Sequence, residues 1–567
     1  MKGVAMRRVL VGLTVMSVVL AVCGPALAES AMRRLPLREY RDKMMAGWIG
    51  QMAGVAWGAP TEFGYIGRII PEDSVPVWQP GMINGAFVQD DLYVEMTFLH
   101  TLEQYGLDVS INQTGIDFAN SQYSLWHANR DGRDQLRRGI APPESGHPQV
   151  NKHADDIDYQ IEADFSGLIA PGLPNLAIAL GEKFGRLMVY GDGLYGGQFI
   201  GGMYAAAFFE NGPIMIVEAG LRCIPPASQY AEAIRDVLLW YRDDPNDWEK
   251  TWNLVNRKYH LDPDYSKFSC GAGRPTIDAK LNGAYVVMGL LFGNGDPEKT
   301  IRIAMRCGQD SDCNPSNAAG VLFTSMGLSR LPEQFKSQLN EESVFSHTAY
   351  DFPGLVKVCE QLARLAVAQN GGRIELDESG EEILVIPVQT PRPSRFEQSW
   401  NPGPFIGVRF SEEERAQILE GSPGLTAAFE FKQFAPEWEL LDCSSDENPG
   451  LRSQLQGRQN VFVTHPPGGG SACTIRRKAH IPFTGKTILR LVVGHDPDGD
   501  WILIVRVDGE EVVRETVGER STTDGWMAMD VDLSAYAGKT VLLELLNQAN
   551  GWAWETGYWA EIELQSD

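Results

Sequence analysis

The spacing of apolar residues changes once along this chain, and the change constrains the fold more than any other feature of the sequence. From residue 35 to about residue 369 the apolar side chains recur mostly at helical spacing, as at Leu92, Met96, Leu99 and Leu102. From about residue 426 onward, short alternating runs such as residues 501–507 are separated by turn residues. The sequence therefore predicts an all-α domain over residues 35–370 and a β-sandwich over residues 426–567, joined by a linker with short strands over residues 371–425.

The first residues have the pattern of a secretory signal peptide. Three basic residues flank the start of an apolar run over residues 9–22, and Ala26 and Ala28 supply the small residues of a cleavage site. The alternative, a lipoprotein signal ending at Cys23, is disfavoured because the bulky Val22 precedes the cysteine. We expect residues 1–28 to be removed and the protein to be exported, to the periplasm or the extracellular space. No other stretch is long and apolar enough to span a bilayer.

The charge balance restricts the possible partners. The 567 residues include 74 Asp and Glu against 49 Lys and Arg, which gives a formal net charge of −25. A surplus of negative charge disfavours binding to phosphate backbones and to anionic lipid. We therefore expect a small-molecule or glycan substrate and no nucleic-acid partner, while the sequence leaves the oligomeric state open.

Two short acidic clusters lie more than two hundred residues apart, each where a loop is expected to enter an apolar helix. They are Gln89-Asp90-Asp91 and Asp310-Ser311-Asp312. Carboxylates crowded at the buried end of a helical domain raise one another's pKa and destabilise the fold unless a divalent cation balances them. Hard oxygen ligands of this kind favour magnesium, manganese or calcium over zinc. We interpret the clusters as two halves of one cation site.

Simpler interpretations of the same residues remain open. An isolated Asp-Asp before a helix is usually an N-cap with a favourable charge for the helix dipole. A second, metal-free interpretation keeps two of the carboxylates as the acid and base of an ordinary glycosidase. The clusters favour a metal site when they are taken together with Glu62, which ends a segment rich in small residues over residues 47–63.

Three segments, taken in order, resemble the ADP-ribosylglycohydrolase family, whose members include the dinitrogenase reductase-activating glycohydrolase. They are the glycine-rich residues 47–63, the acidic residues 88–95, and residues 307–320 with their lead-in at residues 301–304. The resemblance covers roughly residues 38–330. It implies an all-α fold that holds a pair of magnesium ions, with Glu62 near the metals and the reacting sugar. The ligands that it implies are Asp90, Asp91, Asp310 and Asp312.

This sequence departs from the family pattern at three positions. Val55 stands where the family commonly has Asp, Gln89 replaces a threonine ligand, and Cys313 replaces a second threonine. An amide oxygen can still bind a hard cation, whereas a thiol is a poor substitute for oxygen. We therefore expect one or two Mg²⁺ ions, with Mn²⁺ as an alternative and one metal position weakened, lost or differently completed. The predicted metal ligands are Gln89, Asp90, Asp91, Asp310, Asp312 and Cys313, and the predicted catalytic residues are Glu62, Asp91 and Asp310.

Two further segments are candidates for the substrate cleft. Residues 190–197 contain a literal GxGxxG, but no strand-turn-helix unit surrounds it, so a dinucleotide site is disfavoured. We expect instead a flexible loop that walls the cleft, with Asp192, Gly193 and Tyr195 as substrate-binding residues. The acidic run over residues 153–158 is either a solvated helix start or a second part of the cleft wall, and Asp156 is its predicted contact.

The tryptophans of the C-terminal region permit two interpretations. Their aromatic faces suit the apolar faces of sugar rings, so they form a stacking platform in the first interpretation. In the second, alternate residues of each strand fill the sandwich core. The residues concerned are Trp501, Trp526, Trp552, Trp554 and Trp559. The tail over residues 547–552 is similar to those of galactose-binding-like modules, which implies a jelly-roll-like sandwich.

Three functions from different classes follow. The first is a secreted metal-dependent glycohydrolase that cleaves an ADP-ribosyl or related ribosyl linkage, N- or O-glycosidic, as the resemblance implies. The second is a secreted glycoside hydrolase acting on furanosides or other extracellular glycans, with a carbohydrate-binding accessory domain. The third is a non-catalytic glycan-binding protein that retains the scaffold. In the first two, metal ligation orients the sugar and nearby acids stabilise the oxocarbenium-like charge.

Overall fold

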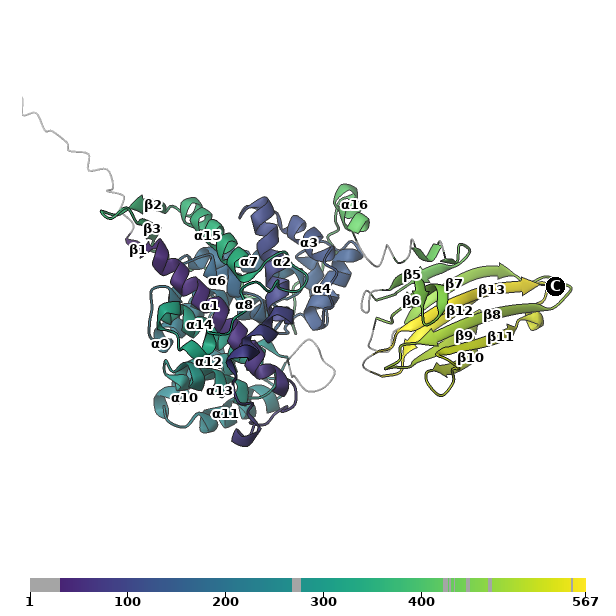
Figure 1. The fold of residues 1–567 in the computed structure, drawn as a ribbon, viewed down its shortest axis with the longest axis horizontal. Helices are drawn as coiled ribbons and strands as arrows, with labels where there is room; N and C mark the ends of the chain where they lie inside the picture. Colours follow the sequence, from purple (N-terminus) through teal and green to yellow (C-terminus); the bar gives the residue numbers. More distant parts are fainter. Residues whose placement is uncertain are drawn as a thin grey trace, which may run out of the picture.

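The computed structural model describes residues 31–267, 277–421, 427, 430–432, 434–444, 449–467, 472–551 and 554–566. The predicted signal peptide over residues 1–28 lies outside these residues. The described chain forms a helical domain followed by a domain of antiparallel strands (Figure 1). The predicted fold class is therefore confirmed. None of the helices in the described part of the chain is both long enough and apolar enough to cross a membrane.

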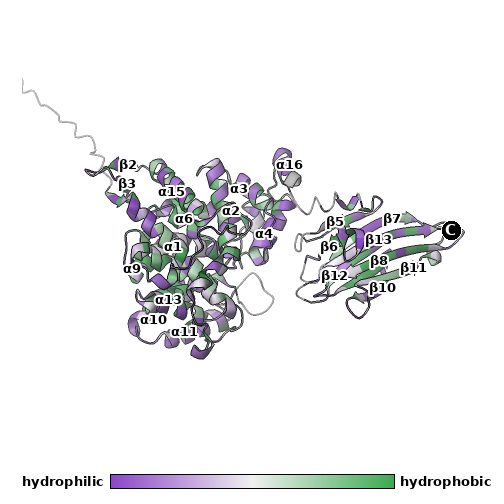
Figure 2. Ribbon diagram, viewed as in Figure 1, coloured by the Kyte–Doolittle hydropathy of each residue, from purple (hydrophilic) through white to green (hydrophobic). Residues whose placement is uncertain are grey.

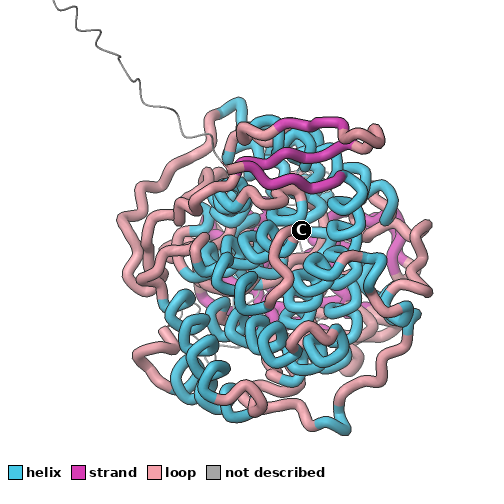
Figure 3. Tube along the Cα trace, turned by 90° about the vertical axis from the view of Figure 1, so that its left-hand side faces the viewer, coloured by secondary structure: helices cyan, strands magenta, loops and turns pink. Residues whose placement is uncertain are grey.

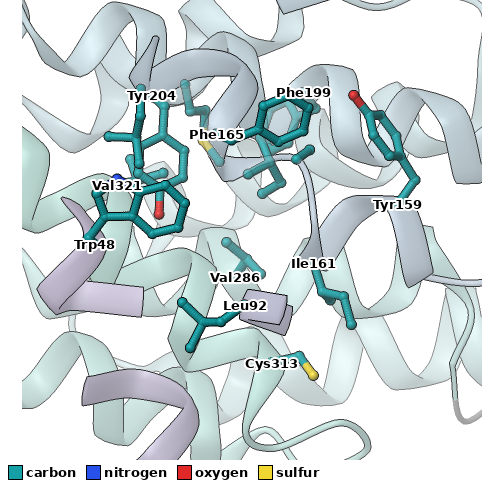
Figure 4. Packing of buried hydrophobic residues seen from close by; sticks show 14 of the residues in the cluster. Trp48, Leu92, Tyr159, Ile161, Phe165, Phe199, Tyr204, Val286, Cys313 and Val321 are labelled. Carbon is teal, nitrogen blue, oxygen red and sulfur yellow. The ribbon is translucent and has the colours of Figure 1, made fainter. Parts of the chain in front are cut away.

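The helical domain is built around one large buried cluster of side chains. Figure 4 shows part of it, including Trp48, Leu92, Tyr204 and Val321. In Figure 2 the hydrophobic stretches lie mainly on the central helices, while the outer helix α4 is mostly hydrophilic. The helices are α1 (Leu37–Gly58), α2 (Asp90–Tyr105), α3 (Ile111–Ala119), α4 (His127–Arg137), α5 (Asp158–Ile161), α6 (Asp164–Leu168), α7 (Pro174–Phe184), α8 (Asp192–Ala207), α9 (Pro213–Leu221), α10 (Gln229–Asp243), α11 (Trp248–Val255), α12 (Ala279–Gly293), α13 (Pro297–Arg306), α14 (Cys313–Met326) and α15 (Phe352–Gln369).

Helices α1 and α14 lie in close contact because glycines line the α1 face. A Cβ at Gly50 would lie 2.5 Å from the carbonyl oxygen of Ala319, and one at Gly54 would lie 2.4 Å from that of Pro315. A Cβ at Gly58 would lie 2.2 Å from the carbonyl oxygen of Ser311. No larger residue fits such distances, so the small residues of α1 set how near it lies to the start of α14.

A three-stranded antiparallel sheet joins the two ends of the helical domain. Its strand order is β1 (Met32–Pro36), β3 (Glu382–Pro387), β2 (Arg373–Leu376), and Leu35 pairs with Leu384. Figure 3 shows these strands lying across one side of the helical body. Residues that the sequence assigns to the linker thus form part of the helical domain's own packing.

The chain that follows β3 runs over the surface of the helical domain, and we call residues 388–411 the strap. The hydroxyl of Tyr195 donates to the Arg395 carbonyl at 2.7 Å. Glu397 forms an ion pair with Arg186 at 2.5 Å. Helix α16 (Glu412–Gly421) comes next and packs on α3 through Glu414, whose carboxylate accepts from Asn112 at 2.8 Å. The strap is therefore held by side chains along its length.

The C-terminal domain consists of two five-stranded antiparallel sheets. Their orders are β10-β9-β12-β7-β4 and β11-β8-β13-β6-β5. The strands are β4 (Glu439–Leu441), β5 (Gly450–Leu455), β6 (Arg458–Thr464), β7 (Ala472–His480), β8 (Thr487–His495), β9 (Trp501–Val507), β10 (Glu510–Val517), β11 (Trp526–Asp532), β12 (Thr540–Ala549) and β13 (Gly557–Ser566).

Most of the tryptophans that were candidates for a sugar platform lie inside the sandwich. Trp501 and Trp559 are fully buried, with ring centroids 5.4 Å apart, and Trp526 is 7% exposed. Trp554 is 45% exposed, and Trp552 lies outside the described residues. The packing interpretation therefore applies to Trp501, Trp526 and Trp559, because buried rings offer no face to a sugar.

Candidate metal centre

The early acidic pair forms the first turn of α2. Gln89 is the N-cap with extended backbone, and Asp90 and Asp91 are the first two helical residues. Carboxylates are favoured here because the helix N-terminus carries partial positive charge. Asp91 is fully buried, whereas Gln89 and Asp90 are partly exposed.

The late acidic pair lies in a tight turn before α14. Gly308 and Gln309 both have positive φ, 76° and 61°, and a Cβ at Gly308 would lie 2.4 Å from the Tyr65 carbonyl oxygen. The glycine is needed there because the left-handed backbone and the close approach both exclude a side chain. The chain then places Asp310 and Asp312 immediately before α14, with Asp312 as the N-cap.

The segment that carries Glu62 is fastened to this turn. The backbone N–H of Phe63 donates to the Gln309 carbonyl at 3.1 Å, and that of Gln309 donates to the Tyr65 carbonyl at 3.2 Å. The hydroxyls of Thr61 and Ser311 lie 2.8 Å apart. These bonds explain why Glu62 lies beside the late acidic pair.

The early and late motifs meet at one cavity of about 660 Å³. The Cys313 thiol donates to Oδ2 of Asp91 at 3.3 Å, so Asp91 lies directly behind the cavity wall. Ligand atoms of Asp310, Asp312 and Cys313 all lie within 4.8 Å of one another. The predicted residues that line the cavity are Glu62, Gln89, Asp90, Asp310, Asp312 and Cys313. The structure thus brings the predicted metal ligands and Glu62 together.

Burial raises the pKa of every carboxyl in this group, and neighbouring carboxylates raise the pKa of most of them further. Burial, with the charges of Asp312 and Asp90, raises the pKa of Glu62 to about 8. Burial and the Asp312 charge raise the pKa of Asp90 to about 6. The pKa values of Asp91 and Asp310 are raised well above their usual range, first by burial and then by neighbouring carboxylates. Such a group of buried carboxylates destabilises the folded protein unless a cation balances its charge.

Unpartnered oxygen atoms indicate that these residues fit a divalent cation. Oδ1 of Asp91 and Oδ1 of Asp310 are buried and have no hydrogen-bond partner among the described residues. Buried carboxylate oxygens normally have a donor or a cation as partner. The oxygen-rich donor set therefore suits a hard metal ion, while the thiol of Cys313 departs from that chemistry.

A second layer of buried polar groups holds the first in place. Glu95, one turn after Asp91, accepts from Gln51 at 2.5 Å and from the Phe165 backbone N–H at 2.9 Å. Asp164 accepts from Tyr204 at 2.7 Å and from Asn317 at 2.8 Å. These bonds tie α1, α2, α6, α8 and α14 to one another around the centre.

The structure places other residues at the cavity that sequence reasoning missed. Phe63, Tyr93, Trp126, His127 and Asn129 line it. Phe63 and Tyr93 stand within the segments 47–63 and 88–95, whereas the positions of Trp126, His127 and Asn129 depend on where α4 lies, which no local pattern in the sequence indicates.

Of the acidic residues 153–158, which were candidates for the cleft wall, some line the cavity and others lie behind it. Asp158 lines the cavity, and burial raises its pKa to about 7. Asp156 is fully buried behind that wall and lies 2.6 Å from Nδ1 of His153.

The other three predicted substrate residues do not line this cavity, and the expected flexible loop is instead the start of α8. A Cβ at Gly193 would lie 2.6 Å from the Ala154 carbonyl oxygen, so glycine serves helix packing here. Asp192 accepts from the Tyr230 backbone N–H at 3.3 Å, and Tyr195 contacts the strap. The GxGxxG pattern misled because glycines that allow close helix packing look the same in sequence as glycines that give a loop its freedom.

Comparisons with known proteins give a family match and two distant structural similarities. The profile of the ADP-ribosylglycohydrolase family matches residues 36–371. A solved structure described as an ADP-ribosylglycohydrolase-related protein complex is 15% identical, with a TM-score of 0.35, and covers 58% of this chain and 99% of that chain. The structure of CBM35 from Paenibacillus barcinonensis is 14% identical, with a TM-score of 0.18, and covers 23% of this chain and 94% of that chain. A comparison with curated proteins finds no match.

Proposed function

Because the chain belongs to the ADP-ribosylglycohydrolase family, which supports a glycohydrolase-type function, we propose that it is an exported, metal-dependent enzyme that cleaves an ADP-ribosyl or related ribosyl linkage. One observation carries the proposal. Two acidic motifs from distant parts of the sequence line a single cavity, beside Glu62, whose pKa is raised to about 8 by burial and the neighbouring carboxylates. Cleavage of a glycosidic bond requires this combination of an acid, which protonates the leaving group, and negative charge, which stabilises the sugar cation.

The proposed metal ligands come from both acidic motifs. We propose Asp90 and Asp91 from α2, Asp310 and Asp312 from the turn before α14, and Gln89 as an amide ligand. Mg²⁺ or Mn²⁺ bound there would lower the pKa of a water molecule and orient the sugar hydroxyls. With a cation holding them ionised, Asp91 and Asp310 would supply buried negative charge against which positive charge can develop on the sugar ring.

Glu62 has the properties of a proton donor. Its pKa of about 8 means that the metal-free side chain is protonated at neutral pH, and it lines the cavity next to Asp312. A carboxylic acid in this state can deliver its proton to the departing group as the glycosidic bond breaks. Phe63 and Trp126, on the same cavity, offer apolar faces to the substrate.

The deciding experiment compares metal content and turnover in the purified protein and three variants. Asp90→Asn and Asp312→Asn remove a ligand from each motif, and Asp108→Asn is the matched control because Asp108 is exposed away from the cavity. We expect bound Mg²⁺ or Mn²⁺ to fall in both site variants and to stay unchanged in the control. Unchanged metal content in both site variants would overturn the shared centre.

The substrate arm of the same experiment separates the function classes. Release of ADP-ribose from a modified protein, abolished by a chelator, supports the proposal. Chelator-sensitive sugar release from furanoside test substrates, without ADP-ribose release, assigns the centre to a glycosidase for extracellular glycans. Glycan binding without turnover at any added Mg²⁺ or Mn²⁺ would overturn both enzymatic functions.

A further inference from the structure

A second group of metal-binding side chains lies on another part of the same cavity. Ligand atoms of His127, Asp156 and Asp158 all lie within 4.8 Å of one another. His127 is the first residue of α4 and Asp158 the first of α5, and both line the cavity. Asp156 is fully buried directly behind them. None of these residues belongs to the aspartate centre described above.

Two backbone hydrogen bonds help to hold the group together. The backbone N–H of Asn129 donates to Oδ1 of Asp158 at 2.8 Å, which fastens α5 to the start of α4. The backbone N–H of Ile157 donates to the Ile277 carbonyl at 2.9 Å, which fixes the turn between the two aspartates. His127 itself has a positive φ of 45°. The three side chains are therefore placed by the surrounding chain and need little ordering to receive a ligand.

Asp156 is oriented by a further histidine. Nδ1 of His153 lies 2.6 Å from Oδ2 of Asp156, and the rings of His153 and His127 have centroids 5.4 Å apart. Ligands of a metal ion are commonly held by such outer hydrogen bonds, which fix their direction.

The chemistry of this group differs from that of the aspartate centre. One imidazole nitrogen with two carboxylates is a mixed donor set, which suits zinc and other first-row transition metals better than magnesium. The cavity leaves space beside His127 and Asp158, and a water molecule or a substrate atom can enter there as a further ligand.

The charge around the cavity favours an additional cation. Asp90, Asp158, Asp310 and Asp312 line it, Asp91 and Asp156 are buried behind its wall, and the Asp90 charge acts on Asp158. Even with Glu62 protonated, these six aspartates outnumber the four positive charges of a pair of divalent ions. A third positive ion beside His127 and Asp158 would reduce repulsion that the predicted pair leaves in place.

We propose that His127, Asp156 and Asp158 form a zinc-binding site, separate from the aspartate centre, with His153 as a positioning residue for Asp156. The site stands whether or not the enzyme cleaves ADP-ribosyl linkages, because it rests on a different set of residues. An ion there would share one cavity with the aspartate centre.

The test uses cobalt as a spectroscopic substitute for zinc. The full-length protein is stripped with a chelator, saturated with Mg²⁺ and titrated with Co²⁺ while visible absorption is recorded. We expect one equivalent of Co²⁺ to give the visible bands of a nitrogen-containing site of low coordination number, and zinc to abolish them. The bands should disappear in His127→Gln and in Asp158→Asn and persist in Asp312→Asn. His100→Gln is the matched control, because His100 is an exposed histidine of α2.

Three results would overturn the proposal. The first is the absence of visible bands in wild type. The second is their persistence in a His127→Gln protein whose circular dichroism is unchanged. The third is a sulfur-to-cobalt band lost in Cys313→Ser, which would place the ion in the aspartate centre. The readout is absorption and not turnover, so a protein without glycohydrolase activity can still be tested for the zinc site. Equally, the absence of the zinc site would leave the proposed glycohydrolase activity untouched.

Discussion

The Sγ atom of Cys313 lies 3.3 Å from Oδ2 of Asp91, although 222 positions separate the two residues in the sequence. This contact joins the first turn of α14 to the first turn of α2. Both helices direct their N-terminal ends toward the same cavity, so their partial positive charges act on the same group of carboxylates. The chemistry of the centre therefore depends on the side chain at position 313.

Exchange of the thiol for a hydroxyl should strengthen magnesium binding. Cys313→Ser keeps the size of the side chain and supplies a hard oxygen donor, so we expect Mg²⁺ affinity to rise about tenfold, or about 1.4 kcal/mol. Isothermal titration calorimetry measures the change. Cys223→Ser is the control, because Cys223 is buried elsewhere and should leave the affinity unchanged. Weaker binding in Cys313→Ser would show that the thiol itself is a ligand.

The metal-free protein should lose stability as the pH rises. The folded-state pKa of Glu62 is about 8, above its usual 4.5, and that of Asp90 is about 6, above its usual 3.8. The folded state therefore holds protons that the unfolded state has released, and this stabilisation is complete below the usual values and lost as pH rises through the folded-state values.

We expect the melting temperature of chelator-treated protein to fall between about pH 5 and pH 8, and Glu62→Gln to make that fall smaller. Saturating Mg²⁺ should reduce the fall as well, since it binds the ionised carboxylates. Differential scanning calorimetry checks both expectations. A melting temperature that rises with pH in the absence of metal would contradict the assigned pKa shifts.

A single methyl group on α1 should disturb the centre from a distance. In Gly54→Ala the new Cβ would lie 2.4 Å from the backbone of Pro315. Because backbone must shift, we expect a loss of about 1–3 kcal/mol in the free energy of unfolding, together with weaker metal binding. Gly85→Ala is the control, since its Cβ would lie 3.9 Å from its nearest neighbour. Denaturant unfolding followed by metal titration measures both effects.

Release of the strap should lower stability without removing a residue from the cavity. Glu397→Gln weakens the ion pair between Glu397 and Arg186. Arg186 is not left unpaired, because Glu182 remains its partner at 3.0 Å. We expect a loss of about 1–3 kcal/mol and faster proteolysis within residues 388–411. Glu378→Gln, on the exposed turn between β2 and β3, is the matched control and should leave proteolysis there unchanged. Equal cleavage rates in wild type and Glu397→Gln would mean that other contacts hold the strap.

The fold class was readable from the sequence because apolar spacing records which side of an element faces a core. Leu92, Met96 and Leu99 are buried on α2, and Leu503 and Val505 are buried on β9. The strap was harder to predict. Its contacts, such as Arg395 with Tyr195, join residues about two hundred positions apart and follow no local periodicity.

The site was predictable only in part, for a related reason. Asp90 and Asp312 stand at helix starts beside a family motif, so the sequence indicates them. His127 stands alone in the sequence and gains its neighbours only when α4 meets α5. Asp192 stands between two glycines, of which Gly191 allows the left-handed backbone before α8 and Gly193 allows close packing of α8, so Asp192 does not line the cavity.

The pairing of β1 with β3 brings the first and last segments of the helical domain side by side, with Met32 opposite Pro387. In a domain whose two ends lie side by side, a short peptide can join those ends while new ends are opened at a surface turn. The result is a circularly permuted protein with the same core. The same geometry allows such a domain to be inserted into a loop of another protein, because that loop's two ends need to be only about as far apart as two paired strands.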